Sequence, residues 1–257
     1  MLGAVLVLSG MCPGDSVFVS PYRLTWPADL ALTGAGAGLA LSGFFLEDGD
    51  PPAWDGVPLD PSGVPAFDRW TVNPYSRELD DAGTALQLAA MATPAVLAAA
   101  DTDQWLTIGV MYAQSVLIVG GLKNTMKGLT DRNRPYMYTD EPSPEGVADG
   151  DRLNSFPSGH TAYAFNGAVF TATVFQEYFP ESPWRVPVIA GSMSLAAATA
   201  VLRVESGNHF FSDVLAGAAI GGLTGRLVPG LHRQDDRPSE GLSITPLPSG
   251  GMVTLRF

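Results

Sequence analysis

The sequence is poor in cysteine and in positive charge. Of its 257 residues only Cys12 is a cysteine, which excludes a framework of disulfide bonds and any metal cluster held by several thiolates. The 14 lysine and arginine residues face 26 aspartate and glutamate residues, so the formal net charge is −12. Because proteins hold nucleic-acid backbones mainly with lysine and arginine, this balance argues against a nucleic-acid partner. Any phosphate-binding site must therefore depend on local clusters of positive charge.

Charged residues of either sign are also scarce, at 16% of the chain, and they are unevenly distributed. Alanine, leucine, glycine and valine dominate the uncharged stretches, which show no two-residue alternation and so favour buried helices over half-exposed strands. There are six such stretches, at residues 30–46, 82–100, 104–122, 161–176, 186–202 and 214–225. The fold class predicted from them is all-α, with a six-helix core bundle.

The bundle has several features of a membrane protein. Most of the stretches approach the roughly 20 residues that a helix needs to cross a bilayer. Trp26, Trp105 and Trp184 each lie just outside one of them, where aromatic residues commonly mark a membrane interface. We therefore predict a transmembrane bundle. A soluble helical bundle is the alternative, because the mean hydropathy of +0.15 is low for six spans and the basic residues show little bias between the links.

The predicted organisation has three parts, an N-terminal segment, a helical domain and a C-terminal tail, at residues 1–29, 30–228 and 229–257. The apolar start of the first part, ending near Cys12, resembles a clipped signal sequence or a lipoprotein anchor. The helical domain carries a loop insertion at 47–81, which is rich in Asp, Pro and Gly and has one short helix near 67–70. Alternating apolar residues in the tail predict a short β-hairpin.

Three polar clusters lie next to ends of the apolar stretches. They run from Lys127 to Pro135, from Pro157 to His160 and from Arg203 to Asp213. If the six helices alternate in direction, the end of the third, the start of the fourth, the end of the fifth and the start of the sixth share one face. The three clusters are therefore predicted to meet at one end of the bundle.

Such a meeting point would bind an anion. Lys127, Arg134 and Arg203 would surround a group that carries two or three negative charges. The second cluster opens the fourth helix, whose free N–H groups bind anions, and Gly159 would let a ligand approach the backbone closely. The Ser158 hydroxyl would add to this phosphate cradle.

Two histidines would add chemistry to the cradle. His209 and Asp213 are four residues apart, so on a helix they share a face, and the carboxylate would fix the imidazole tautomer. The free ring nitrogen of His209 would then be a nucleophile toward phosphorus. His160 would protonate the leaving oxygen and later activate water, and the ordinary histidine pKa near 6.5 suits both roles.

Together the three clusters resemble the signature of the type 2 phosphatidic acid phosphatase and vanadium haloperoxidase superfamily. That signature is Lys, six residues and Arg-Pro, then Pro-Ser-Gly-His, then Arg, five residues, His, three residues and Asp, and every position is matched here. For the phosphatase branch the resemblance implies a phosphohistidine on His209, with His160 as acid and then base, and neither a metal nor another cofactor. One departure is Leu202, where the family often has a serine that adds a hydrogen bond.

Other polar residues near the clusters are given simpler interpretations. We expect Arg132 and Arg152 to be solvated charges, although Arg132 would also suit steering of a phosphate. The acidic stretch 140–151 is expected to be an exposed loop, and His232 a structural residue.

The predicted function is metal-independent hydrolysis of a lipid-like phosphomonoester or diphosphate, of the phosphatidate, isoprenyl diphosphate or lipid A type. The predicted location is the cell envelope, and the resemblance implies a site that faces the periplasm or the exterior. Three alternatives are a soluble periplasmic acid phosphatase, a vanadium-dependent haloperoxidase, and a non-catalytic membrane scaffold or transporter with a phosphate pocket. The sequence makes no prediction of the oligomeric state.

Overall fold

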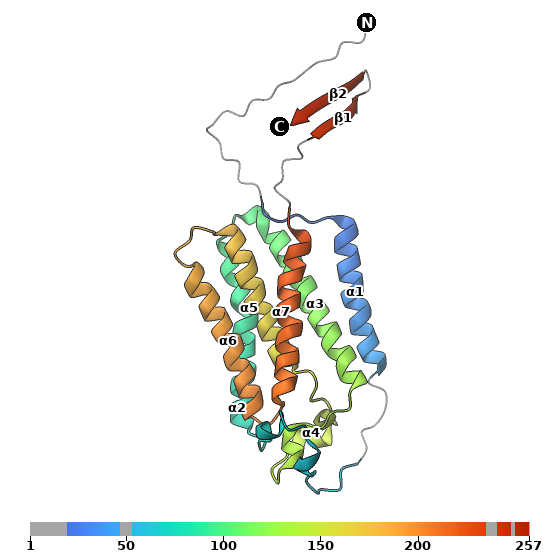
Figure 1. Cartoon of the computed structure of the whole chain (residues 1–257), viewed down its shortest axis with the longest axis vertical. Coiled ribbons are helices and arrows are strands. Elements are labelled where there is room, and N and C mark those ends of the chain that lie inside the picture. Colours follow the sequence, from blue (N-terminus) through green and yellow to red (C-terminus); the bar gives the residue numbers. More distant parts are fainter. Residues whose placement is uncertain (1–19, 47–52, 235–240, 248–249, 257) are drawn as a thin grey trace.

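The structure, a computed structural model, describes residues 20–46, 53–234, 241–247 and 250–256. The predictions of a clipped signal sequence and of a lipoprotein anchor lie outside the described residues. Six long helices run up and down in a bundle (Figure 1). They are α1 (Trp26–Leu46), α2 (Arg77–Ala92), α3 (Trp105–Leu129), α5 (Gly159–Tyr178), α6 (Arg185–Glu205) and α7 (Phe211–His232). This confirms the predicted all-α fold with six core helices.

The helices differ from the uncharged stretches mainly at their ends. α2 begins five residues before its stretch because Ser76 caps it, with Oγ 3.4 Å from the backbone nitrogen of Leu79, and because acidic residues favour a first turn. The α-helix also ends at Ala92, before the end of the uncharged stretch at residue 100. Pro94 removes a backbone donor, and the chain continues as the 3-10 helix η3 (Thr93–Ala99).

Short elements fill the links. Five further 3-10 helices are η1 (Pro61–Gly63), η2 (Arg69–Thr71), η4 (Thr102–Gln104), η5 (Pro135–Tyr138) and η6 (Asp151–Leu153). The short helix expected near 67–70 corresponds to η2. An unpredicted helix, α4 (Pro144–Ala148), forms because Ser143 caps it and a proline occupies its first position. At the position of the predicted hairpin, β1 (Gly241–Leu247) pairs antiparallel with β2 (Gly250–Arg256).

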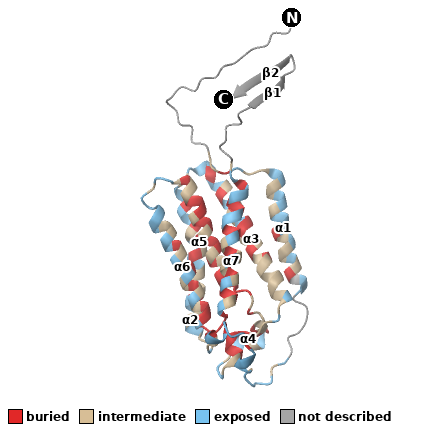
Figure 2. Cartoon of the chain, viewed as in Figure 1, coloured by how far each residue is buried: buried red, intermediate tan, exposed pale blue. Residues whose placement is uncertain are grey.

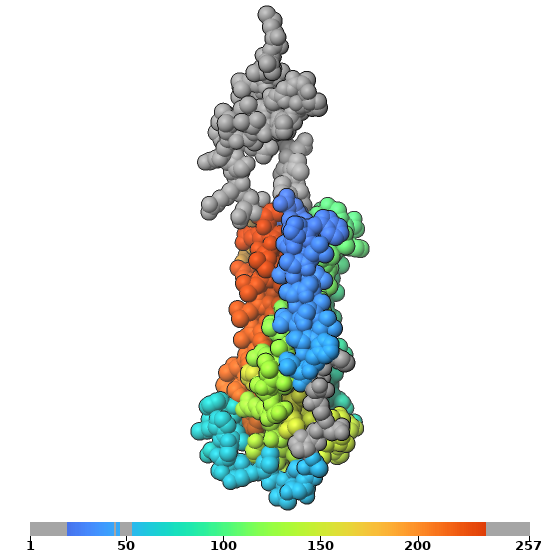
Figure 3. Space-filling view, turned by 90° about the vertical axis from the view of Figure 1, so that its right-hand side faces the viewer, coloured from blue at the N-terminus to red at the C-terminus, as the bar shows by residue number. Residues whose placement is uncertain are grey.

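The core is centred on α5, which packs against α2, α3, α6 and α7. Buried residues lie all along α5, on more than one face of the helix (Figure 2). α1 instead packs mainly against α3 and forms a separate column along one side of the molecule (Figure 3). The end of the bundle that carries the three polar clusters is built mainly by the five remaining helices and the links between them.

Glycines bring α7 into close contact with α5. Gly217, Gly221 and Gly225 occur at intervals of four residues along one face of α7. A Cβ atom at any of the three would collide with a backbone carbonyl oxygen, either of α5 or of Ser158, which directly precedes it. Small residues at this spacing let helices approach closely, as is common in membranes. The close contact fixes the start of α7 beside the start of α5.

The outer surface suits a lipid environment. Four segments are long and apolar enough to cross a membrane by length and composition, at Arg77–Ala99, Thr102–Leu129, Arg185–Glu205 and Phe211–His232. Many large apolar side chains are exposed along the bundle, including those of Leu41, Leu106 and Leu223. Exposing so much apolar surface to water would be unfavourable. These observations agree with the predicted transmembrane bundle.

Three exposed tryptophans mark one end of the bundle. Trp26 and Trp105 begin α1 and α3, and Trp184 directly precedes α6, so all three lie at the end opposite α4 (Figure 1). Their exposed fractions are 81%, 50% and 67%. Tryptophan is enriched at the level of lipid headgroups, so this end is the natural position of one membrane interface.

The close contact of α5 with α7 gives the first prediction. Gly221→Ala should destabilise the protein by about 1–3 kcal/mol, because the added methyl group has no room against the α5 backbone. The measurement is the apparent Tm in detergent. Gly222→Ala is the matched control, since its Cβ would meet only Val169 at 3.8 Å. Equal Tm values for the two variants would contradict the packing described here.

Candidate active site

The three polar clusters meet at the end of the bundle where α4 lies (Figure 1). Lys127 is in the last turn of α3, and Arg203 is in the last turn of α6. His160 is the second residue of α5, and His209 lies just before Phe210, the residue that caps the start of α7. The charges of Lys127, Arg134 and Arg203 act on both imidazole rings. The ends of α3 and α6 and the starts of α5 and α7 therefore lie at one end of the bundle, as the alternating helix directions predict.

Arg203 is held deep in the site with one donor unused. Its side chain is 2% exposed, and its Nη1 atom forms an ion pair with the carboxylate of Asp80 on α2. It packs directly against Gly83, where a Cβ would be in ordinary contact at 3.4 Å from Cδ of Arg203. The buried Nε atom of Arg203 has no hydrogen-bond partner among the described residues. An oxyanion would supply the missing acceptor.

Arg134 is fixed by the loop that follows α4. Its Nη1 donates to Oδ1 of Asn208 at 2.7 Å, and its Nη2 lies 2.5 Å from Oδ2 of Asp151. Its Nε donates to the backbone carbonyl of Asp151 at 2.9 Å. The prediction that residues 140–151 form only an exposed loop was therefore wrong, because the carboxylate at its end orients a cation of the site.

His209 is held as a neutral ring. It is almost fully buried, and its Nδ1 donates to the backbone carbonyl of Ser155 at 2.7 Å, which leaves the lone pair on Nε2. Burial, followed by the charges of Arg134 and Arg203, holds the pKa of His209 well below the usual 6.5. The imidazole is therefore unprotonated at neutral pH, which is the nucleophilic form.

The structure corrects the role predicted for Asp213. Its Oδ2 atom lies 3.9 Å from Nδ1 of His209, which is beyond hydrogen-bond distance, so the Ser155 carbonyl sets the tautomer instead. The same oxygen accepts from Oγ of Ser155 at 2.6 Å and from the backbone nitrogen of Phe210 at 2.8 Å. Asp213 therefore positions His209 indirectly. It binds Ser155, whose carbonyl contacts the imidazole ring, and the backbone nitrogen of Phe210, the residue after His209.

Arg132 is the third partner of Asp213 and belongs to a buried network. Its guanidinium forms ion pairs with Asp213 and, at 2.7 Å, with Asp68 from the 47–81 insertion. It also donates to Oγ of Ser212 at 2.8 Å and lies 4.4 Å from the centroid of the Phe210 ring. The prediction of a solvated charge was wrong, since Arg132 joins the insertion to the start of α7.

α2 contributes two residues that the motif analysis missed. Nε2 of His160 lies 3.1 Å from Oγ1 of Thr84, and this hydroxyl donates its own proton to the backbone carbonyl of Asp80. The hydroxyl therefore accepts from Nε2–H of His160. The signal available in the sequence was a pair of polar residues four apart, Asp80 and Thr84, at the start of an apolar stretch.

The residues before His160 differ from their predicted roles. The fully buried Ser158 caps α5, with its Oγ 3.4 Å from the backbone nitrogen of Thr161 and 2.9 Å from its hydroxyl. The predicted phosphate-binding hydroxyl is thus occupied in the cap. Beside Gly159, a Cβ would lie 2.6 Å from Cδ of Lys123, so this glycine makes room for a lysine of α3 rather than only for a ligand.

Of the two remaining expectations, the one for Arg152 was wrong and the one for His232 is confirmed. Arg152 is buried rather than solvated, and its carbonyl accepts from the backbone nitrogen of Arg134 at 2.8 Å. His232 is a structural residue as expected, with its ring nitrogens bound to the carbonyl of Val228 and the carboxylate of Asp29, both at 2.8 Å. Across the described ranges, no three His, Cys, Asp or Glu side chains are close enough to hold a metal ion.

The family of the chain follows from a family model described as the PAP2 superfamily, which matches residues 104–237. The chain belongs to the PAP2 superfamily. All three clusters lie inside the matched region, whereas Asp68, Asp80 and Thr84 lie outside it. The N-terminal part of this PAP2 protein, outside the matched region, thus also supplies residues to the site.

Two curated relatives are lipid A 1-phosphatases. The protein from Porphyromonas gingivalis is 38% identical over 127 residues, which cover 49% of this chain and 24% of the relative. The protein from Rhizobium etli is 36% identical over 117 residues, covering 45% of this chain and 46% of the relative. The chain thus covers less than half the length of either relative.

One solved structure is also similar. It is described as the first transmembrane PAP2 type phosphatidylglycerolphosphate phosphatase from Bacillus subtilis. The sequences are 20% identical, the TM-score is 0.35, and the match covers 77% of this chain and 95% of that chain.

The Arg132 network gives the second prediction. Arg132→Ala should lower the free energy of unfolding by about 3–5 kcal/mol, because it leaves the buried carboxylates of Asp68 and Asp213 without their cation. Arg77→Ala is the matched control, since Arg77 pairs with Glu145 on the exposed surface, where such a pair contributes little to stability. Apparent Tm values in detergent would compare the two variants. A smaller loss for Arg132→Ala than for Arg77→Ala would contradict the structural role of the network.

Proposed function

We propose that this protein is an integral membrane phosphatase that hydrolyses a lipid-like phosphomonoester or diphosphate through a phosphohistidine. The observation that carries the proposal is the buried, neutral His209 with a free Nε2 lone pair, among the charges of Lys127, Arg134 and Arg203. The similarity to two lipid A 1-phosphatases supports a glycolipid phosphate as the first substrate to test.

The three cations would bind the phosphate before the reaction. The unused Nε donor of Arg203 supports this role, because a phosphate oxygen would satisfy it. Arg134 and Lys127 would stabilise the charge on the remaining oxygens, which develops further in the transition state of phosphoryl transfer. Asp80 and Asp151 balance the arginines before the substrate arrives, so the cations are already oriented.

The reaction would proceed in two steps. In the first, Nε2 of His209 attacks phosphorus, the P–N bond forms, and the P–O bond to the leaving group breaks while His160 gives a proton to the leaving oxygen. Burial, followed by the charge of Arg203, lowers the pKa of His160 to about 3, so the negative charge of the bound phosphate must raise this pKa before His160 can act as the acid. In the second, His160 takes a proton from water, and the oxygen of this water attacks phosphorus. The P–N bond then breaks, inorganic phosphate leaves, and His209 regains its lone pair.

The location of the site suits a lipid substrate. The site lies at one end of a bundle whose outer surface is apolar, so the headgroup would enter at the membrane surface while the acyl chains stay in the bilayer. We propose that this end faces the periplasm or the exterior of the cell.

The phosphohistidine is the third prediction. His209→Ala should lower kcat for a phosphatidate or lipid A substrate by at least about 10³-fold and abolish an acid-labile phosphoenzyme trapped with labelled substrate. His232→Gln is the control, because His232 is equally buried but lies at the opposite end of α7. A phosphoenzyme that persists in His209→Ala would exclude the proposed nucleophile. The same assays with EDTA test independence from metal.

Thr84 gives the fourth prediction. Thr84→Val should lower kcat about tenfold with little change in KM, because the hydroxyl orients His160 without contacting substrate. The hydroxyl stabilises the protonated ring by accepting from Nε2–H, so its loss should also move the alkaline limb of the kcat profile to lower pH. The charges that act on this ring are those of Lys127, Arg134, Arg203 and Asp80, all unchanged in the variant.

Two further variants separate this role from a structural one. Thr84→Ser keeps the hydroxyl and should restore both kcat and the pH profile. Thr93→Val removes another hydroxyl from the same segment, one that bonds the carbonyl of Ala90, and should leave the pH profile unchanged. A normal kcat and pH profile in Thr84→Val would refute the positioning role.

A further inference from the structure

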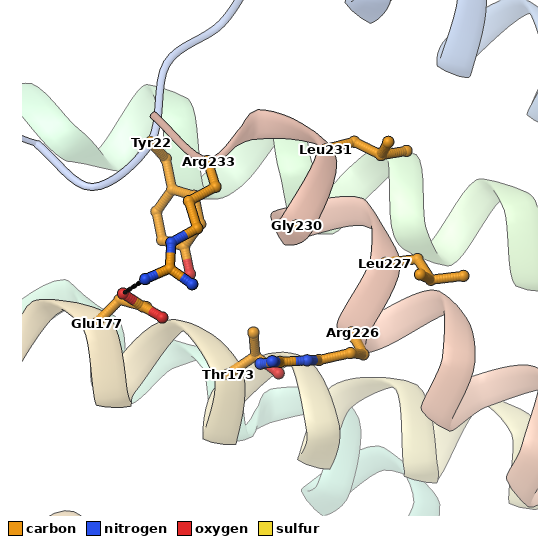
Figure 4. Close-up of a pocket in the computed structure, with 8 residues that line it drawn as sticks. All are labelled: Tyr22, Thr173, Glu177, Arg226, Leu227, Gly230, Leu231 and Arg233. Carbon is orange, nitrogen blue, oxygen red and sulfur yellow. Dashed lines mark ion pairs between the residues drawn. The ribbon is translucent and has the colours of Figure 1, made fainter. Parts of the chain in front are cut away.

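A cavity lies at the end of the bundle opposite the candidate active site. It has a volume of about 330 Å³ and is formed between the last turns of α5 and α7, with Tyr22 closing one side (Figure 4). Pockets of this size bind small molecules or the polar groups of larger ones. None of the residues placed in the catalytic site lines it.

Two largely buried side chains, Tyr22 and Thr173, present their hydroxyl groups to this cavity. Tyr22 is 3% exposed and Thr173 is 6% exposed, and both line the cavity. Neither hydroxyl has a hydrogen-bond partner in the part of the chain that the structure describes. Burial, with the nearby Glu177 carboxylate as the next contribution, raises the pKa of Tyr22, so its hydroxyl remains a donor. A ligand with acceptor oxygens would satisfy both groups.

The charge of the cavity fits a single negative charge. The guanidinium of Arg226 extends beside Thr173 (Figure 4) and forms no ion pair within the described ranges. Arg233 lies across the cavity, with its Nη2 atom 3.2 Å from Oε2 of Glu177. Two arginines and one glutamate leave one positive charge, which matches the charge of a phosphodiester.

The position of the cavity points to a lipid. It lies at the end of the bundle that the exposed Trp26, Trp105 and Trp184 mark, which is the level of lipid headgroups. On its α7 side, Leu227 and Leu231 are also exposed and would contact acyl chains below a bound headgroup. A free anion would use the polar groups but not this apolar border.

We propose that this cavity binds the phosphodiester headgroup of an anionic phospholipid as a site separate from catalysis. Tyr22 and Thr173 donate hydrogen bonds to the phosphate oxygens, and Arg226 and Arg233 balance the charge. The chains lie along Leu227 and Leu231.

The test uses the full chain, purified in a non-ionic detergent, and measures the apparent Tm during titration with short-chain phosphatidylglycerol. A saturable rise in Tm is expected, and Arg226→Gln should raise the half-maximal lipid concentration about tenfold. Tyr22→Phe removes only one hydroxyl and should act in the same direction. Arg185→Gln is the matched control, because Arg185 lies at the same end but bonds Gln176 outside the cavity, and it should leave the titration unchanged.

Titrations with two other ligands show which part of the lipid raises the Tm. Short-chain phosphatidylcholine should stabilise less, because its headgroup adds a positive charge, and glycerol 3-phosphate should not stabilise at these concentrations. Hydrolysis of a soluble aryl phosphate reports that each variant is folded. The proposal is overturned if wild-type protein shows no saturable rise in Tm, or if Arg226→Gln and Tyr22→Phe both titrate like wild type. It is also overturned if glycerol 3-phosphate raises the Tm as much as the lipid does. Loss of the effect in Arg134→Gln, at the other end of the bundle, would likewise exclude it.

Discussion

The buried carboxylate of Asp213 is the contact on which the geometry of the active site depends. It accepts hydrogen bonds from the segment before α5, through Ser155, and from the turn before α7, through the backbone of Phe210. It also pairs with Arg132 from the segment after α3. One side chain therefore joins the three parts of the chain that carry the motif residues. His209 takes its orientation from this arrangement, although it does not contact the carboxylate directly.

The site concentrates positive charge in a chain that carries a net charge of −12, and the structure balances this locally. Arg203 is paired with Asp80, Arg134 with Asp151, and Arg132 with Asp68 and Asp213. Two of these carboxylates belong to segments that precede the region matched by the PAP2 model. The N-terminal half of the chain thus supplies counter-charges that keep buried guanidinium groups oriented at a tolerable desolvation cost.

The sequence allowed the helices and the place of the site to be predicted because both depend on simple patterns. Long uncharged stretches must be buried or face lipid, and alternating helix direction decides which ends meet. The partner of His209 was beyond this reasoning, since spacing places Asp213 on the right face but contains no information about the Ser155 carbonyl that lies closer.

The predictions for Arg132 and Ser158 failed for related reasons. Arg132 looked solvated because its acidic partner Asp68 is 64 residues away, in a segment without helical periodicity. Ser158 suggested a ligand contact, although a serine at the start of a helix is equally suited to cap it, and the backbone of α5 uses it in this way.

The one-sided packing of α1 would let the protein adapt to bilayers of different thickness. This helix has 21 residues, a length of about 31 Å, and packs mainly against α3, whereas α5, α6 and α7 pack among themselves. A helix held on one side can tilt to match the surrounding hydrocarbon layer. Because its neighbour α3 also packs against α5 and α7, such a tilt would be taken up by α1, and the positions of His160 and His209 would be preserved.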